Sequence, residues 1–240
     1  MNATKILLLA VALLLATTSL KADDAIRDPY ESLNRKAFAV HLVLDKYLAR
    51  PIATVYKTAL PTPIRRSIGN MLGTWSMPIT MANDALQGEW RKLGTDSARF
   101  GINMTIGLAG IIDMASHLGM TKQSEDFGQT LARYGIKSGP YLFIPLLGPS
   151  TPRHLVGRSF DTFLDPVTYL QEHEYRDSIT GLGIINSRAN LIEPLDDLEK
   201  SSSDLYTSYK SFYWQNRQFE INNGSTTFES LPDISALDDE

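Results

Sequence analysis

The chain has 240 residues, of which 43% are hydrophobic and 21% are charged, so it carries enough apolar material for one or two packed domains. It has 23 Lys and Arg against 27 Asp and Glu, a net charge of −4, which argues against a nucleic-acid-binding protein because such proteins are usually basic. There is no cysteine, which excludes disulfides, zinc–thiolate sites and cysteine nucleophiles, and we expect no lipid attached through an N-terminal cysteine.

The first residues have the three parts of a secretory signal peptide. Lys5 precedes an apolar run at residues 6–16, and small polar residues and Ala22 follow. The run is too short for a transmembrane anchor. We therefore predict that residues 1–22 are a signal peptide cleaved after Ala22, with Ala25 as the second choice of site. A buried N-terminal helix is the alternative.

The next segment is predicted to form a long amphipathic helix. Asp28 is expected to cap it, and Pro29 to occupy its first position. Pro51 is expected to end it, because the residue before a proline avoids the helical conformation. One stripe of apolar residues recurs along it at helical spacing: Leu33, Ala37, Val40, Leu44 and Tyr47.

Helical periodicity continues through most of the chain, with apolar stripes in residues 86–93, 182–192 and 205–219. Pro194 is expected to stop the second of these helices. The third is expected to begin with a capping box of Ser201 and Asp204 and to end near Gly224. The sequence thus predicts an all-α fold, with residues 23–228 as one helical domain. Residues 229–240 contain five acidic residues and no basic one, which predicts a disordered acidic tail.

Evidence for strands is confined to one segment. In TLARYGIKSGPYLF, Gly135 and Gly139 bracket a predicted short hairpin. The backbone freedom of the two glycines makes this hairpin, with Lys137 between them, our candidate for a mobile gate. A rigid turn with structural glycines is the alternative.

Three stretches carry no charge: residues 67–83, 101–112 and 139–152. Each is too short to span a membrane and is interrupted by Gly, or by Gly and Pro. They fit the core helices of a soluble domain, or re-entrant helices that enter a bilayer part-way and surround a pore. In the second case their irregular backbone is tolerable only where protein or a water-filled cavity covers it.

The sequence offers little for catalysis or metal binding. Its histidines are scattered, and His173 lies between two glutamates that point to other sides of a helix. Ser150 lies in a Gly-Pro-Ser turn, and Glu125 and Asp126 are expected to start a helix or to pair with Arg133. We predict no catalytic residue, no metal site and no cofactor.

Basic residues flank the uncharged stretches. Such cations are candidates for contacts with lipid headgroups at a membrane interface, although solvated surface charge is the simpler interpretation. The candidate headgroup contacts are Arg133, Lys137 and Arg153. Asn70, Asn83 and Asn103 are further candidates for a polar path.

From about residue 28 to residue 222, the chain resembles the MlaA family, also called VacJ, of outer-membrane phospholipid-transport proteins. Four segments carry the resemblance in family order: DPYESLNRKAF, RPIATVYKTALPTPIRRSIGNMLGTWSMPITMANDALQG, RFGINMTIGLAGIIDMA and EDFGQTLARYGIKSGPYLFIPLLGPSTPRH. The motif positions include Asn34, Arg35, Pro78, Asn83, Gln87, Gly88, Asn103, Asp113, Asp126, Gly128, Gly148 and Pro149. His154 departs from the pattern, which has Asp there.

The resemblance implies a single-domain ring of amphipathic and re-entrant helices around a central channel, lying in the periplasmic leaflet of the outer membrane. It implies phospholipid as cargo, with a trimeric outer-membrane porin and a periplasmic lipid-carrier protein as partners. The implied activity removes mislocalised phospholipid from the outer leaflet, passes it to the carrier and so maintains lipid asymmetry, without a catalytic step. Because relatives are acylated at a cysteine that this chain lacks, we expect a protein that is not a lipoprotein.

Two other functions compete with this one. A soluble periplasmic lipid-binding or scaffold protein is favoured by the missing cysteine. A periplasmic hydrolase acting on lipid or cell wall would require a Ser/His/Asp or two-carboxylate arrangement in a cleft.

Overall fold

The structure is a computed structural model that describes residues 26–224, and these are mostly helical with one small antiparallel sheet. The predicted signal peptide and the predicted acidic tail lie outside the described residues. The helices are α2 (Glu31–Leu44), α3 (Arg50–Ala59), α4 (Thr62–Trp75), α5 (Met77–Gln87), α6 (Trp90–Thr105), α7 (Met114–His117), α8 (Phe127–Arg133), α9 (Pro152–Leu164), α10 (His173–Asn190), α11 (Ile192–Ser201) and α12 (Leu205–Ile221). The strands are β1 (Leu142–Ile144) and β2 (Gly148–Ser150).

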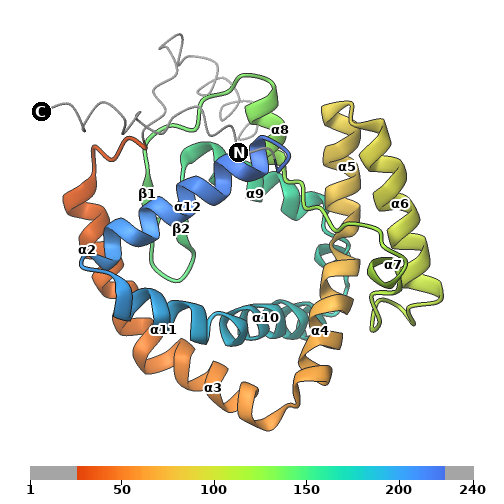
Figure 1. Cartoon of the computed structure of the whole chain (residues 1–240), viewed down its shortest axis with the longest axis horizontal. Coiled ribbons are helices and arrows are strands. Elements are labelled where there is room, and N and C mark those ends of the chain that lie inside the picture. The colour runs from red at the N-terminus through yellow and green to blue at the C-terminus, as the bar shows by residue number, and fades with distance from the viewer. Residues whose placement is uncertain (1–25, 225–240) are drawn as a thin grey trace, which may run out of the picture.

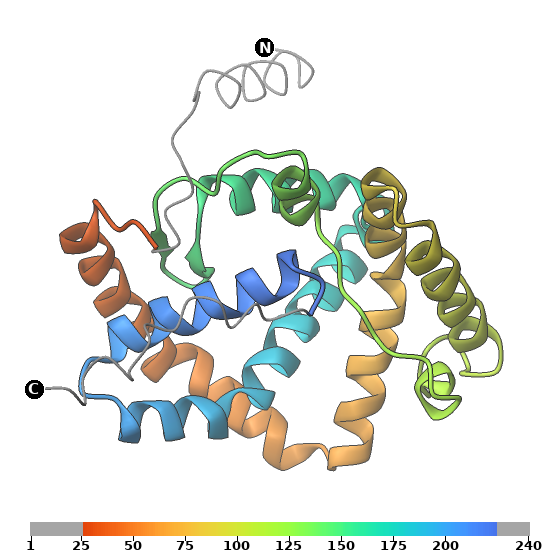
Figure 2. The same ribbon diagram turned by 45° about the horizontal axis from the view of Figure 1, so that its top comes forward.

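The helices follow one another around a ring (Figure 1). α2 and α3 form its left and lower sides, α4 and α5 its right side, and α8 and α9 its upper side. α10 returns along α3 and α4, and α11 and α12 follow it back toward the hairpin. α6 and α7 pack beside α5 as an arm outside the ring, as the tilted view also shows (Figure 2). The predicted all-α ring with one hairpin is confirmed.

α2 and α3 form one rod, because the helix does not end at Pro51. A π-helical segment, Asp45–Ala49, joins the two without a break. The wider π turn relieves the clash between a proline ring and the carbonyl of the preceding turn, and for this reason the predicted stop is wrong. The predicted cap is wrong as well: α2 begins at Glu31, and Asp28 instead accepts hydrogen bonds from Asn34 and Tyr206.

Several other helix ends differ from the prediction. The stripe at residues 86–93 crosses two helices, because Gly88 adopts a left-handed conformation and ends α5. Ser201 closes α11, while Asp204 alone caps α12 by accepting from the Tyr206 N–H at 3.1 Å. Pro194 lies in the first turn of α11, where its missing N–H costs no helical hydrogen bond. The predicted end near Gly224 is confirmed, since its N–H donates to the Phe219 carbonyl at 2.9 Å.

The hairpin exists, but it lies further along the chain than predicted. Gly135, at a φ of +79°, ends α8 instead of opening a strand, and the N–H of Ile136 donates to the Leu131 carbonyl at 3.0 Å as in a helix C-cap. Gly139, at a φ of +76°, turns the chain toward β1. The strands pair with Phe143 opposite Pro149.

The apolar core is small and aromatic. The ring of Phe38 in α2 packs edge-on against Phe143 of β1, with 5.1 Å between ring centroids, and against Tyr206 of α12, with 5.7 Å. Tyr141 completes this buried cluster. It fixes the hairpin between the first and last helices. Elsewhere the buried side chains are largely polar or charged, so hydrogen bonds and ion pairs join much of the ring.

The three uncharged stretches take different forms. Residues 67–83 belong to α4 and α5, residues 101–112 to the end of α6 and an irregular turn, and residues 139–152 to the hairpin. The last stretch is therefore not a re-entrant helix. Within residues 26–224 no helix has the length and apolar character needed to cross a bilayer.

Candidate functional site

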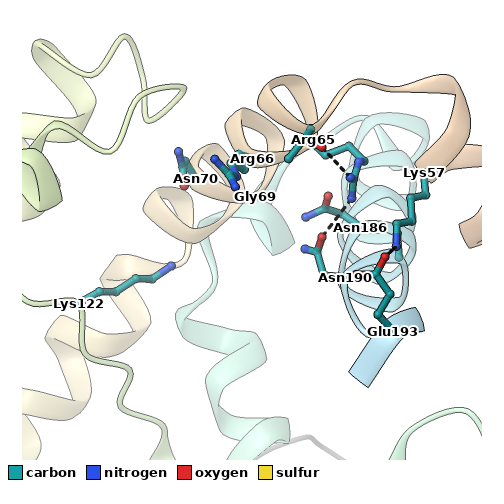
Figure 3. Close-up of a pocket in the computed structure, with 11 residues that line it drawn as sticks. Lys57, Arg65, Arg66, Gly69, Asn70, Lys122, Asn186, Asn190 and Glu193 are labelled. Carbon is teal, nitrogen blue, oxygen red and sulfur yellow. Dashed lines mark hydrogen bonds and ion pairs between the residues drawn. The ribbon is translucent and has the colours of Figure 1, made fainter. Parts of the chain in front are cut away.

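A cavity with a volume of about 530 Å³ lies between α3, α4, α10 and α11 (Figure 3). Its walls are polar. They are formed by Lys57, Thr62, Arg65, Arg66, Gly69, Asn70, Lys122, Asn186, Ala189, Asn190 and Glu193. Four cations and one carboxylate are among them, so the cavity favours a ligand with negative charge.

The cations of this cavity differ in their partners. Lys57 is paired with Glu193 at 2.9 Å. Arg65 donates only to neutral oxygens, including that of Asn190 at 3.4 Å. Arg66 and Lys122 have no hydrogen-bond or ion-pair partner among residues 26–224. Their charges are free to meet a ligand.

Two further cavities continue the polar surface. One, of about 170 Å³, lies between α4, α6 and the segment before α8, and it shares Asn70 and Lys122 with the first. The other, of about 340 Å³, lies beside α6 and shares Gln123 with the second. The three cavities, which we call the compartments, are thus neighbours with common wall residues.

The side of α3 that faces away from the cavity carries exposed apolar residues. On α3, Ile52 and Val55 are exposed and lie roughly 140–160° around the helix from Lys57. The same exposed face continues along α2, where Leu33 is 64% and Val40 is 51% exposed. We call these side chains, together with Val43, Tyr47 and Leu48, the apolar belt.

A second exposed apolar patch lies on the α6–α7 arm, in the uncharged stretch at residues 101–112. It consists of Met104, Ile106, Leu108, Ile111 and Ile112. Leu146 and Leu147 at the tip of the hairpin are exposed as well. So many exposed apolar side chains within one short segment are unusual on a protein surrounded by water and typical of one that contacts lipid or a partner.

The predicted headgroup contacts do not line these cavities. Arg133 is paired with Glu89, and Lys137 is an exposed loop residue. Arg153 is buried, and its guanidinium donates to the Ile136 carbonyl at 2.6 Å. Burial and the nearby Arg217 lower the pKa of Arg153 to about 10. The structure does not bring the three together at one site.

The predicted gate residues lie in the loop between α8 and the hairpin. Gly139 packs against Pro152 at the start of α9, so a Cβ there would lie 3.0 Å from the proline ring. Gly135 has open space around it. Movement of this loop, with Lys137, stays a prediction.

The family-motif positions at the start of the chain tie α2 to the hairpin and to α12. Asn34 is buried, donates to the Tyr141 carbonyl at 3.0 Å and accepts from the Phe143 N–H at 3.0 Å. Arg35 pairs with Asp204 at 2.6 Å.

A second set ties α5 to α8 and α9. Asn83 donates to Asp161 at 3.0 Å and accepts from the Thr130 hydroxyl at 2.8 Å. Gln87 donates to Glu125 and to Thr130, each at 3.1 Å. Asn83 is therefore a fully buried structural residue and not part of a polar path.

A third set holds α7 on α6. Asp113 caps α7 and pairs with Arg99 at 3.2 Å, and Asn103 donates to it at 2.9 Å. Burial alone would raise the pKa of Asp113, but hydrogen bonds from Ser116 and Asn103 outweigh it and hold the pKa at about 2. Asn103 also lines the second cavity, and its role in a polar path stays a prediction.

The remaining motif positions shape the upper side of the ring. Asp126 caps α8, as expected, but it pairs with Arg217 at 2.7 Å and not with Arg133. Gly128 lies against Gly157 of α9, where the two helix backbones touch. Pro78 and Gly88 lie at the start and just past the end of α5, and Gly148 and Pro149 lie in β2.

Two arrangements superficially resemble hydrolase sites. Ser150 lies 3.4 Å from His154, but Ser150 is 1% exposed, and burial together with Arg217 lowers the pKa of His154 to about 4, which makes it a weak base. Asp84 and Asp96 form a carboxyl pair between α5 and α6, yet both are buried, at 0% and 2% exposure. Asp96 borders the cavity beside α6, but its side chain is almost fully enclosed, and Asp84 lines none of the three cavities.

Sequence reasoning missed part of the cavity wall. The sequence predicts Asn70 as part of a polar path, but Lys122 and Asn186 carry no comparable pattern. These residues come from distant segments, and only the return of α10 along α3 and α4 brings them together.

Comparisons with known proteins agree with this architecture. A family model described as MlaA lipoprotein matches residues 26–220. An Escherichia coli K12 protein named intermembrane phospholipid transport system lipoprotein MlaA is 32% identical over 98% of this chain and 94% of its own length. A Haemophilus influenzae protein of the same name is 30% identical, covering 86% and 84%. A Rickettsia bellii protein is 34% identical, covering 81% and 76%.

A solved structure is similar as well. It superposes with a TM-score of 0.73 and 31% identity, covering 81% of this chain and 99% of the other, and is described as the structural basis for maintenance of bacterial outer membrane lipid asymmetry.

These comparisons overturn one expectation. The family model and the named relatives are lipoproteins, so the prediction that this protein is not a lipoprotein is wrong. That prediction rested on the absence of cysteine, which bears only on a lipid attached through a thiol. It carries no information on how members of the family associate with the membrane. Association with the outer membrane is supported.

Proposed function

Because the chain belongs to the MlaA lipoprotein family, we propose that it is the outer-membrane component of a phospholipid-transport system. It takes mislocalised phospholipid from the outer leaflet and passes it to a periplasmic lipid carrier, which maintains the lipid asymmetry of the outer membrane. In this role the protein binds and guides lipid, and no covalent bond is made or broken.

One observation carries the mechanism: α3 presents Lys57 to the polar cavity and carries exposed Ile52 and Val55 of the apolar belt on its other side. A phospholipid headgroup loses several kcal/mol for each polar group left unpaired in hydrocarbon, so it needs a wet, polar path. The apolar belt provides the surface that acyl chains and the surrounding leaflet contact. The headgroup then moves through the polar compartments while the tails stay in apolar surroundings.

The periplasmic leaflet is the proposed site of insertion, because the helices enter a membrane only part-way. A trimeric porin and a periplasmic lipid carrier are the proposed partners, since a lipid must reach the ring from the outer leaflet and leave it toward the periplasm. Co-purification from mild detergent, with identification of bound proteins and lipids, tests both partners. The exposed apolar belt favours insertion over the alternative of a soluble lipid-binding or scaffold protein.

Asn70 offers the sharpest test, because it lines the first two compartments. An Asn70→Trp variant places a large ring where they meet and is expected to block headgroup passage. In a host that lacks its own family member, this variant should leave phospholipid in the outer leaflet, as measured by labelling of surface-exposed phospholipid.

The matched control is Asn216→Trp on the exposed side of α12, which makes the same change away from the cavities. It should restore asymmetry as the unmodified chain does. Full restoration by Asn70→Trp, at equal protein level and helical content, would remove the cavities from the transport path.

A further inference from the structure

The cavities contain more positive charge than their own walls neutralise. Glu193 is the one carboxylate lining the first cavity, and Lys57 pairs with it at 2.9 Å. Besides Lys57, the charge of Arg65 also acts on Glu193 and helps to lower its pKa, whereas Arg66 and Lys122 remain without an anionic partner among the described residues. A ligand that brings negative charge would satisfy them.

The position of Lys122 strengthens this observation. Its ammonium lies directly against α4, because a Cβ on Gly73 would be 3.0 Å from Nζ. Lys122 thus reaches α4, the helix that carries Arg66, from the segment between α7 and α8 (Figure 3). It lines both the first and the second compartment.

The start of α4 adds to the same potential. Pro61 occupies the N-cap position and supplies no capping side chain, so the partial positive charge of the helix N-terminus is uncompensated. Thr62, the first helical residue, lines the cavity. Arginine and lysine at such a position are the groups that proteins use to bind phosphate.

We propose that Arg66 and Lys122, assisted by Arg65, bind the phosphate of the transported lipid and give the protein a preference for net anionic headgroups. This proposal rests on the proposed function. An anionic headgroup brings negative charge that pairs with the excess cations. A zwitterionic headgroup also carries a positive group, which would enter a cavity whose only carboxylate is already paired. The preference is an electrostatic property of the cavity, and it weakens with salt.

The experiment measures binding of two fluorescent lipids, phosphatidylglycerol and phosphatidylcholine, to the full-length protein in mild detergent. The unmodified chain is expected to bind phosphatidylglycerol about three- to tenfold more tightly. The double variant Arg66→Gln/Lys122→Gln should bind both lipids with nearly equal affinity. Lys36→Gln/Arg158→Gln removes the same two charges from exposed positions that line none of these cavities, and it should keep the preference.

The outcomes separate the proposal from the proposed function. Equal binding of both lipids by the unmodified chain, or an unchanged preference in Arg66→Gln/Lys122→Gln, overturns headgroup selection while leaving lipid transport standing. Failure of the unmodified chain to bind either lipid counts against the proposed function itself. A competition experiment with inorganic phosphate separates a lipid site from a site for free phosphate. If phosphatidylglycerol is displaced only at high phosphate concentration, the cations bind the lipid. If phosphate saturates the site and the two lipids bind equally, the cations bind free phosphate instead.

Discussion

Asp84 shows how a single buried group couples the fold to pH. Neither of its carboxyl oxygens accepts a hydrogen bond from a donor among the described residues, and Asp96 and Glu125 are acidic neighbours. Burial, and then the charge of Asp96, raise the pKa of Asp84 to about 7. Lys92 offsets part of this effect on Asp84, and Arg99 lowers the pKa of Asp96. At neutral pH one proton is therefore shared within the pair.

The linkage predicts a loss of stability as pH rises. The unfolded chain releases the proton of Asp84 near its ordinary pKa of 3.8, whereas the folded protein keeps it to about 7. The free energy of unfolding should therefore fall between roughly pH 4 and pH 7 and level off above that range.

Asp84→Asn removes this dependence, because its amide can donate to Asp96 at any pH. We expect the variant to be about 1–3 kcal/mol more stable than the unmodified chain at pH 8, measured by thermal melts from pH 5 to pH 8. Asp177→Asn, at a side chain that is 74% exposed, is the charge-matched control and should change little. Parallel pH profiles for Asp84→Asn and the unmodified chain would contradict the shared proton.

At the scale of elements, the contact between α8 and α9 depends on two glycines. A Cβ on Gly157 would lie 2.4 Å from the backbone nitrogen of Gly128, so any larger residue forces the helices apart. Gly157→Ala is expected to cost about 2–3 kcal/mol, seen as a lower melting temperature.

Gly181→Ala in α10 makes the same substitution in open space. It should be neutral or stabilise by about 0.5–1 kcal/mol, because alanine is the better helix former. Similar melting temperatures for Gly157→Ala and Gly181→Ala would show that α8 and α9 are not in close contact in solution.

The elements also show what the sequence predicts and where it stops. Helical spacing predicts most helices, and the resemblance predicts their closure into a ring. Predicted element boundaries were wrong where local backbone geometry differed from the usual pattern. The π turn before Pro51 lets the helix continue, and Gly135 in the left-handed conformation ends α8 instead of opening a hairpin. Periodicity also cannot tell which side of a helix faces inward: Leu33, Val40 and Tyr47 form the predicted stripe, yet all are more than half exposed.

The candidate site was less predictable than the fold, because its charges are contributed by segments distant in sequence. Arg133 and Lys137 are candidates because they lie near an uncharged stretch in the sequence, but neither lines any of the three cavities. Lys122 lies in a polar loop that contains no motif. Its proposed contact with a headgroup follows only from the position of that loop beside α4. Nearness of charged residues in the sequence does not predict which of them share a cavity, because helices from distant segments pack side by side in the ring.

At the scale of the whole molecule, the apolar belt should hold the ring in the membrane. Val40 and Val55 are 51% and 67% exposed on the α2–α3 rod. Placing Glu at both positions puts charge where hydrocarbon is expected, at a cost of several kcal/mol. We expect Val40→Glu/Val55→Glu to raise the fraction of protein that carbonate releases from outer membranes.

Ser203→Glu, in the exposed link between α11 and α12, adds charge away from the belt and should leave release unchanged. If Val40→Glu/Val55→Glu stays as firmly bound as Ser203→Glu, the belt does not contact lipid, and a covering partner protein becomes the better explanation of its exposure.

The sharing of Asn70 and Lys122 by two neighbouring compartments has a kinetic consequence. A second headgroup in the adjoining space would compete for the same ammonium. We therefore expect the two compartments to hold one lipid at a time, so that the rate of delivery levels off once each ring is occupied, however much lipid accumulates in the outer leaflet.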